Sequence, residues 1–314
     1  MKPIELHLEL THACPLNCAP CDHRLAGSAD LELSALKKLF RSRSLKDLRL
    51  ISISGGEPTL HPRFEDTALA AAGAFPDAKI VILTSLYEPW RLERFLKKLP
   101  PENLGRIHIG SSLDGPPRVH NRIRGRAGAF GRLEAAHRRL KKACPGISSG
   151  FTFTVSSLNA AHFYAAWQAA LYRLGAPLGV QFLVQNPNTR GIEQGAGEKA
   201  VLARSLRRVL AEIREEPRAR GLYSAGEELQ LKLALDFLLS GKAGPAGSCG
   251  AGRSFAMLSP EGRFYLCPFH KDITLGRVET PFHNFWTDAN ARRAHARAGR
   301  RACARCFLRC AVKV

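Results

Sequence analysis

The sequence predicts an α/β fold for the first 190 residues of the 314-residue chain, and three observations lead to this prediction. Short apolar runs recur along this part of the chain. Stretches with apolar residues three and four positions apart, which is helical spacing, separate the runs. After residue 190 the alternation stops. Alternating strands and helices imply parallel strands with right-handed crossovers, so the candidates are a doubly wound sheet and an open barrel of about six β/α units.

The predicted strands are short apolar runs of the kind that parallel sheets bury. They span residues 4–10, 48–54, 79–85, 106–112, 150–156 and 178–184. The predicted helices between them each carry an apolar face that would pack on the sheet. They span residues 34–43, 63–75, 89–99, 129–143 and 162–175.

The rest of the chain is organised differently. The elements expected there are a loop, two helices and a Gly-rich linker, at residues 186–200, 198–216, 227–240 and 241–252. Residues 254–269 alternate around the turn Ser-Pro-Glu-Gly, which predicts a hairpin. A last helix-like stretch leads into the cysteines of residues 303–310. We therefore divide the chain into a β/α part, a helical connector and a small cysteine-bearing module, at residues 1–190, 191–240 and 241–314.

The composition is that of a globular protein, with 45% hydrophobic and 24% charged residues. The N-terminus lacks the basic, apolar and small-residue regions of a signal peptide. No apolar run approaches the roughly 18 residues of a membrane span. We therefore expect a cytoplasmic protein without a membrane partner.

The net charge is +20, and much of it is local. Residues 118–142 hold nine Lys and Arg and one acid, and residues 291–309 hold seven arginines and no acid. Such charge suits an anionic partner, which can be nucleic acid, an acidic peptide or a phosphorylated substrate. The alternative is that these arginines only solvate helix surfaces.

Three of the nine cysteines, Cys14, Cys18 and Cys21, lie on the loop that would follow the first strand. That loop is at the carboxyl end of the predicted parallel strands, where α/β folds place their sites. In a reducing compartment, clustered cysteines indicate metal or redox chemistry more than disulfides. A zinc site normally needs a fourth ligand, and His12 and His23 flank the loop. An iron–sulfur cube with three cysteine ligands would instead leave one iron open for a substrate.

A second motif, Gly55-Gly56-Glu57-Pro58, follows the next predicted strand. Its glycines permit close backbone approach, and its Glu-Pro pair forms an acidic corner on the same face as the cysteines. Together with residues 111–125 (SSLDGPPRVHNRIRG), the two motifs resemble the radical S-adenosylmethionine (SAM) superfamily over residues 4–190. The resemblance implies a partial (β/α)6 barrel of TIM type, followed by a small cysteine-rich α+β module.

The resemblance also implies roles for individual residues. Cys14, Cys18 and Cys21 would hold a [4Fe–4S] cluster whose open iron binds SAM. Gly55, Gly56 and Glu57 would contact the SAM amino group, and Pro58 would belong to the same cofactor-binding corner. Pro20 stands where the family often has an aromatic residue, so its carbonyl can meet the adenine but no ring can stack on it.

Residues after later strands would complete the SAM pocket. Ser112 and Asp114 would approach the ribose or the substrate, unless Asp114 only caps its own turn. Arg124 would pair with the SAM carboxylate, because a guanidinium binds a carboxylate bidentately. The alternatives to this arginine are Arg122 and Arg126. Two strand threonines that would line the pocket, or simply pack within their strands, are Thr84 and Thr154. No catalytic acid or base is assigned.

The other cysteines gather near the C-terminus, except Cys144, which we interpret as structural. The C-terminal group consists of Cys249, Cys267, Cys303, Cys306 and Cys310. Their spacing resembles the SPASM and twitch extensions of radical SAM enzymes, which implies one auxiliary [4Fe–4S] cluster. Its ligands would be Cys249 and Cys267 with two of the last three cysteines. A structural zinc remains the alternative.

The function that the resemblance implies is reductive cleavage of SAM, giving a 5′-deoxyadenosyl radical that abstracts hydrogen from a substrate C–H bond. We expect the substrate to be a peptide or protein that undergoes maturation or oxidation; an acidic peptide or a phosphorylated metabolite fits the basic charge. A flavodoxin- or ferredoxin-type protein would supply the electron. The alternatives are a small-molecule radical SAM dehydrogenase, radical SAM modification of nucleic acid, and a non-catalytic zinc- or nucleic-acid-binding protein.

Overall fold

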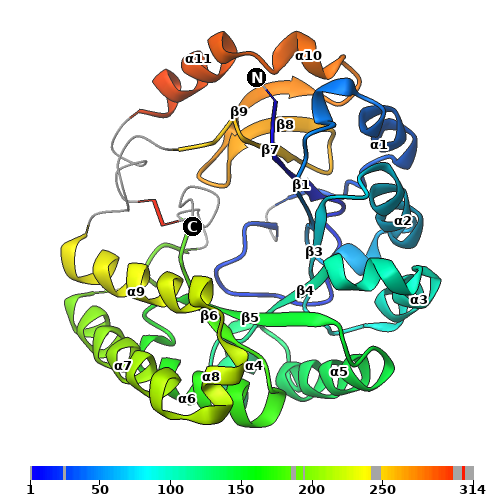
Figure 1. Cartoon of the computed structure of the whole chain (residues 1–314). Coiled ribbons are helices and arrows are strands. Elements are labelled where there is room, and N and C mark those ends of the chain that lie inside the picture. Colours follow the sequence, from blue (N-terminus) through cyan, green and yellow to red (C-terminus); the bar gives the residue numbers. More distant parts are fainter. Residues whose placement is uncertain are drawn as a thin grey trace.

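The computed structural model describes residues 2–23, 26–184, 189–193, 195–241, 249–299 and 306–307. Within these ranges, nine strands form one sheet in the order β6-β5-β4-β3-β2-β1-β7-β8-β9. The strands are β1 (Glu5–Glu9), β2 (Leu50–Ser54), β3 (Lys79–Leu83), β4 (Ile107–Ser112), β5 (Ser148–Val155), β6 (Leu178–Phe182), β7 (Phe255–Leu258), β8 (Arg263–Cys267) and β9 (His270–Arg277). Since β6 and β9 are the outer strands, the curved sheet is an open barrel (Figure 1).

The first six strands are parallel, and each pairs with the next one along the chain. The helices that join them lie outside the sheet (Figure 1). They are α1 (Leu33–Phe40), α2 (Phe64–Ala74), α3 (Trp90–Lys98), α4 (Pro117–Ile123), α5 (Ala129–Ala143) and α6 (Phe163–Gln168), which a π-helical turn (Ala169–Leu174) continues. The α/β fold and the partial barrel are confirmed. The strand order runs without a reversal, which rules out the doubly wound alternative.

Helices also follow the sixth strand in the described ranges. They are α7 (Ala196–Glu215), α8 (Pro217–Leu222), α9 (Ala225–Ser240), α10 (Phe282–Phe285) and α11 (Asp288–Ala298). The sequence predicts α7, α9 and α11, whereas the short α8 and α10 were not predicted. Apolar residues of α6, α7 and α9 pack with β5 and β6 in one hydrophobic cluster. None of the helices in the described ranges has both the length and the apolar character needed to cross a membrane.

The C-terminal strands extend the same sheet. β7 is parallel to β1, with Leu8 opposite Leu258, and β8 and β9 continue antiparallel. The predicted hairpin at residues 254–269 is therefore present as β7 and β8. β9 was not predicted, because its residues His-Lys-Asp-Ile-Thr-Leu-Gly-Arg are largely polar. α4 was also missed, since it is short and begins at a proline.

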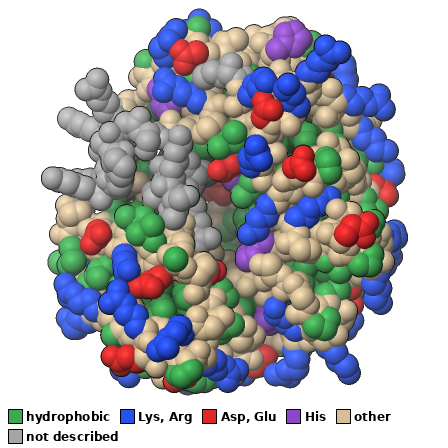
Figure 2. Space-filling view, viewed as in Figure 1, with side chains coloured by type: hydrophobic (Ala, Val, Ile, Leu, Met, Phe, Trp, Pro, Cys, Tyr) green, Lys and Arg blue, Asp and Glu red, His purple; other side chains and the backbone are tan. Residues whose placement is uncertain are grey.

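The inner face of the barrel is largely polar, although Val81 and Leu83 of β3 also lie on it. Along β5, Phe151 and Phe153 are buried whereas Thr152 and Thr154 are half-exposed. Successive side chains of a strand point to opposite faces, so the half-exposed set lines the interior. Its other members include His7, His108, Ser112 and Gln181. TIM barrels normally fill this space with bulky branched side chains. Here it stays open to a ligand, and Figure 2 shows a hollow near the centre of this view.

Candidate metal centre and cofactor site

The first three cysteines lie on the loop that leaves the carboxyl end of β1, as predicted. The loop is held on one side by the segment that follows β2. The Gly56 amide donates to the Thr11 carbonyl at 2.7 Å, and the Glu57 amide donates to the Ala13 carbonyl at 2.8 Å. A Cβ at Gly56 would lie 2.5 Å from the Ala13 oxygen, and one at Gly55 would lie 2.6 Å from the Thr11 oxygen. The two glycines therefore let the backbone of one loop rest directly on the other.

The other side of the cysteine loop is held by the end of α4. The Asn17 amide donates to the Arg124 carbonyl at 3.1 Å, and the Ala19 amide donates to the Ile123 carbonyl at 2.8 Å. Gly125 has a φ of +61°, and a Cβ there would collide with the Asn17 carbonyl. The loop is thus clamped between two glycine-containing segments, which fixes its thiols before any ligand binds.

The three thiols affect one another electrostatically. Desolvation raises the pKa of Cys14 to about 12, and Cys18, Glu57 and Cys21 add to that rise. Desolvation also raises the pKa of Cys21, with Cys18 again adding to it. Thiols in such surroundings ionise when a cationic centre binds them and compensates the negative charge.

The donor set fits an iron–sulfur cluster. All three donors are thiols, which soft metal centres and iron–sulfur clusters prefer. Across the part of the chain that the structure describes, no three His, Cys, Asp or Glu side chains converge tightly enough to hold one metal ion. A cube does not require such convergence, because each thiolate binds a different iron.

Glu57 is wholly buried and its carboxylate is engaged inside the protein. Oε1 accepts hydrogen bonds from the hydroxyls of Thr59 and Thr84 at 2.8 and 2.7 Å. Oε2 accepts from the amide and the hydroxyl of Ser85 at 2.7 and 2.6 Å. The carboxylate therefore ties the end of β2 to the end of β3. Thr84, expected to line the pocket, holds Glu57, and the buried Pro58 begins the short turn after it.

Asp114 and Arg124, predicted to contact different parts of SAM, bind each other in the structure. Nε and Nη2 of Arg124 both lie 2.6 Å from Oδ2 of Asp114, whose side chain is 1% exposed. Burial raises the pKa of Asp114, and the adjacent guanidinium opposes that rise. Nη1 of Arg124 points to the Sγ of Cys18 at 3.5 Å. The sequence could not reveal this pairing, because the two residues are ten positions apart on either side of a helix.

The remaining predicted SAM contacts are on the same side of the molecule. Ser112 is the last residue of β4, half-exposed and opposite Thr152 of β5. Thr154 lies further along β5, also half-exposed. Pro20 is half-buried on the cysteine loop, one residue before Cys21.

The C-terminal cysteines are placed in part. Cys249, Cys267 and Cys306 are half-buried, whereas Cys303 and Cys310 lie outside the described residues. Desolvation raises the pKa of Cys267 to about 12, backbone amides of Phe269 and His270 oppose this, and Cys249 and Cys306 increase it. Cys249 and Cys306 therefore both lie within electrostatic range of Cys267, although they are 57 positions apart in sequence.

Phe307 anchors Cys306 to the opposite side of the open barrel. Its ring contacts Phe182 of β6 and Phe237 of α9, with centroids 5.1 and 5.2 Å apart. Gln181 Nε2 donates to the Phe307 carbonyl at 3.2 Å.

A charged network that the sequence did not predict connects the cysteine loop to the C-terminal strands. Lys271 lies 3.2 Å from the carboxylate of Glu9 and 3.0 Å from that of Asp22, next to Cys21. His12 Nε2 lies 2.6 Å from Oε1 of Glu261. Burial alone would raise the pKa of Glu9, but His23 and Lys271 lower it to about 2. These groups line a cavity of about 210 Å³. The only sequence signal was the pair of histidines flanking the cysteines.

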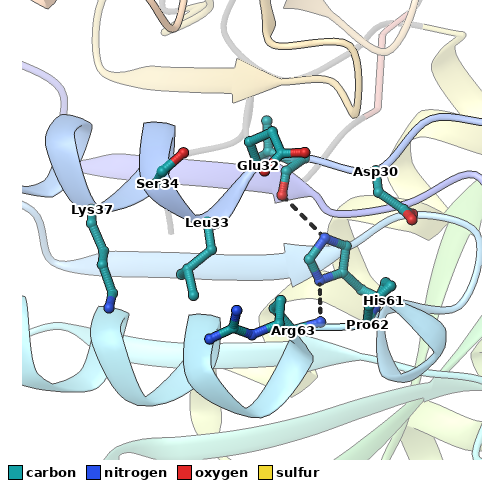
Figure 3. Close-up of a pocket in the computed structure, with 9 residues that line it drawn as sticks. Asp30, Glu32, Leu33, Ser34, Lys37, His61, Pro62 and Arg63 are labelled. Atoms are coloured by element: carbon teal, nitrogen blue, oxygen red, sulfur yellow. Dashed lines mark hydrogen bonds between the residues drawn. The ribbon is translucent and has the colours of Figure 1, made fainter.

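Another cavity, of about 400 Å³, lies at the start of α1 (Figure 3). The His61 ring contacts the Leu31 carbonyl at 3.1 Å and accepts from the Arg63 amide at 3.2 Å. The cavity is also lined by Asp30, Glu32, Ser34 and Lys37. None of the predicted site residues lines it.

Family models match two parts of the chain. Residues 8–166 match the radical SAM superfamily, and residues 249–310 match an iron–sulfur cluster-binding domain, SPASM. The second match includes all five C-terminal cysteines.

Similar curated proteins carry names of peptide cyclases and maturases. The chain is 32% identical over 143 residues to the PqqA peptide cyclase of Ruegeria pomeroyi, which is 44% of this chain and 37% of that protein. It is 29% identical over 130 residues, 41% of this chain and 30% of the other, to the sporulation killing factor maturation protein SkfB of Bacillus subtilis. It is 25% identical over 300 residues, 92% of this chain and 71% of the other, to the mycofactocin maturase MftC of Mycobacterium tuberculosis. The chain thus spans well under half the length of the first two relatives.

Solved structures share the fold. Native anSMEcpe with bound AdoMet superimposes with a TM-score of 0.69 at 19% identity, over 93% of this chain and 83% of the other. Streptococcus suis SuiB bound to S-adenosylmethionine gives 0.69 at 16% identity, over 92% and 67%.

Proposed function

Because this chain belongs to the radical SAM superfamily, we propose that it is an enzyme that cleaves SAM reductively in order to mature or oxidise a peptide or protein. The observation that carries the proposal is the loop of three thiols clamped at the carboxyl end of the barrel. The loop opens toward a polar interior, where Ser112 and Thr154 are accessible. That arrangement suits a small cofactor and a substrate bound side by side.

In this proposal, the residues of the chain bind the cluster or position the loop that carries it. Cys14, Cys18 and Cys21 hold the [4Fe–4S] cluster, and Gly55 and Gly56 keep their loop in place. The chemistry that the bound cofactors supply is one-electron cleavage of SAM to methionine and a 5′-deoxyadenosyl radical, which removes a hydrogen atom from a C–H bond. The barrel wall would hold the substrate next to the bound cofactor and away from water.

The same geometry supports the SAM contacts that we propose. Glu57 acts by fixing the backbone at the end of β2, and Pro58 starts the turn that completes this corner. Ser112 faces the interior and is available to the ribose. The Pro20 carbonyl is the contact proposed for the adenine.

An auxiliary [4Fe–4S] cluster fits the SPASM match at the other end of the chain. Cys249, Cys267 and Cys306 are its proposed ligands, with Cys303 or Cys310 as the fourth. A cluster there can take the electron left on a substrate radical, which would complete a two-electron oxidation.

The proposed substrate is a peptide or protein, in line with the names of the three curated relatives. The charge of +20 favours an acidic one. A flavodoxin- or ferredoxin-type protein is the proposed electron donor. Oxygen-sensitive thiolate clusters also favour a reducing compartment, which supports our expectation of a cytoplasmic protein.

The test is anaerobic turnover. Reconstituted protein should contain about eight irons and eight sulfides per chain, and it should release 5′-deoxyadenosine when reduced in the presence of SAM. Replacing Cys14, Cys18 and Cys21 together by Ala should abolish this product. The matched control is Cys144→Ala, since Cys144 packs beside the core at the end of α5 and should leave turnover unchanged. Undiminished 5′-deoxyadenosine from the triple variant would refute the proposal.

A further inference from the structure

Arg124 forms a direct contact with a proposed cluster ligand. Its Nη1 donates toward the Sγ of Cys18 at 3.5 Å. The same guanidinium is bound through Nε and Nη2 to Oδ2 of Asp114, at 2.6 Å each. Two edges of one planar group are therefore engaged, one by a buried carboxylate and one by a thiol.

The surroundings hold this guanidinium in place. The Asp114 carbonyl accepts a hydrogen bond from Asn159 Nδ2 at 3.2 Å, and the Asp114 amide donates to His120 Nδ1 at 3.2 Å. The backbone of Arg124 is in turn bonded to the cysteine loop through the Asn17 amide. The side chain is only 16% exposed, so little water screens its charge.

We propose that Arg124 tunes the reduction potential of the cluster held by Cys14, Cys18 and Cys21, with Asp114 as its anchor; this rests on the function proposed above. Hydrogen bonds to ligand sulfurs and nearby positive charge stabilise the more negative, reduced state of an iron–sulfur cluster. Arg124 provides both at one sulfur. The paired Asp114 carboxylate faces the opposite edge of the guanidinium, so the cation is the nearer charge to the thiolate. Arg124 is in this sense a positioning residue, acting through Cys18.

The experiment is a redox titration of the reconstituted holoenzyme, followed by electron paramagnetic resonance without SAM or substrate. The variant is the double replacement Asp114→Asn with Arg124→Gln, which removes both charges together and leaves no unpaired buried ion. Its midpoint potential should shift to a more negative value than that of the wild type. Arg124→Lys, which keeps the charge but not the fork of donors, should give a smaller shift in the same direction.

Arg122→Gln is the matched control. Arg122 lies in the last turn of α4, two residues before Arg124, is exposed and donates to the Leu158 carbonyl instead of a cysteine. Its replacement should leave the potential unchanged. The inference is overturned if the double variant holds a full cluster at the wild-type potential, or if Arg122→Gln produces the same shift. It is also overturned if the folded double variant cannot retain the cluster, because the pair would then be needed for assembly. A wild-type protein without any reducible cluster would instead overturn the proposed function.

Discussion

At the scale of single residues, the site depends on positions without a side chain as much as on the side chains that are present. The cysteine loop approaches its neighbours so closely that no side chain fits at Gly55, Gly56 or Gly125. Gly55 and Gly56 were predicted to contact SAM. The structure gives these two a second reason to be glycine, which is the packing of one backbone on another, and the same reason applies to Gly125.

Gly56→Ala should therefore disrupt the cysteine loop. The added Cβ would lie 2.5 Å from the Ala13 carbonyl oxygen, so the backbone must move. We expect a loss of about 1–3 kcal/mol in the free energy of unfolding, as for other overpacked sites, together with reduced iron content. Chemical denaturation and iron analysis would measure both.

Gly131→Ala is the control for that change. Nothing lies within 4 Å of a Cβ at Gly131 on α5, so alanine should be tolerated and should slightly favour the helix. Full iron content in Gly56→Ala would show that the two loops are not packed as tightly as the structure indicates.

Individual residue roles were harder to predict from sequence than the motifs that contain them. The cysteine spacing and the Gly-Gly-Glu-Pro motif predict that these residues follow the first two strands at the carboxyl end of the barrel, and this position is confirmed. The partners of Asp114, Arg124 and Glu57 could not be predicted, because each pairing forms between segments that only the folded chain brings together.

At the scale of elements, periodicity predicts most strands and helices. The six parallel strands are short apolar runs, the five helices predicted between them have helical spacing, and all of these elements are present. β9 was missed because only two of its residues, Ile273 and Leu275, are large and apolar, and polar residues flank them. The alternating pattern of β1 also could not predict the ion-pair partner of Glu9, because that partner, Lys271, lies 262 positions away in sequence.

The link between β1 and β9 should make stability depend on acid pH. The pKa of Glu9 is lowered from its ordinary 4.5 to about 2, so ionised Glu9 stabilises the folded chain above its unfolded pKa. That contribution, roughly 3 kcal/mol, should disappear as the pH falls from about 4.5 to about 2. Denaturation of cluster-free wild type and Glu9→Gln at several pH values would measure it. The difference between the two proteins should be largest at neutral pH; a constant difference across this range would contradict the assignment.

At the scale of the whole molecule, charge is the feature that stands out. Lys and Arg side chains are spread over the face seen in Figure 2, around the central hollow. Arg118, Arg122, Arg126 and Arg132 are exposed on α4, α5 and the turn between them, beside the segment that holds the cysteine loop. A negatively charged electron donor docked there would be close to the proposed cluster.

Reduction by such a donor should depend on salt. Attraction between opposite charges speeds association and is screened as ionic strength rises, so the rate should fall at least about tenfold between low and high salt. Arg118→Glu with Arg126→Glu should reduce the low-salt rate by a similar factor in stopped-flow measurements. Arg204→Glu with Arg207→Glu on α7 is the charge-matched control and should have little effect. Equal losses in both double variants would mean that net charge matters and location does not.

The pairing of β1 with β7 has a consequence for biosynthesis. The ribosome makes β1 first, whereas the strand that covers one of its edges emerges about 250 residues later. Because translation proceeds at roughly 5–20 residues per second, that edge of β1 stays unpaired for many seconds on the nascent chain. Contacts between such distant segments also form slowly. Folding of the barrel is therefore expected to finish only after translation of the last strands. A chaperone that shields an open β edge would raise the yield of folded protein.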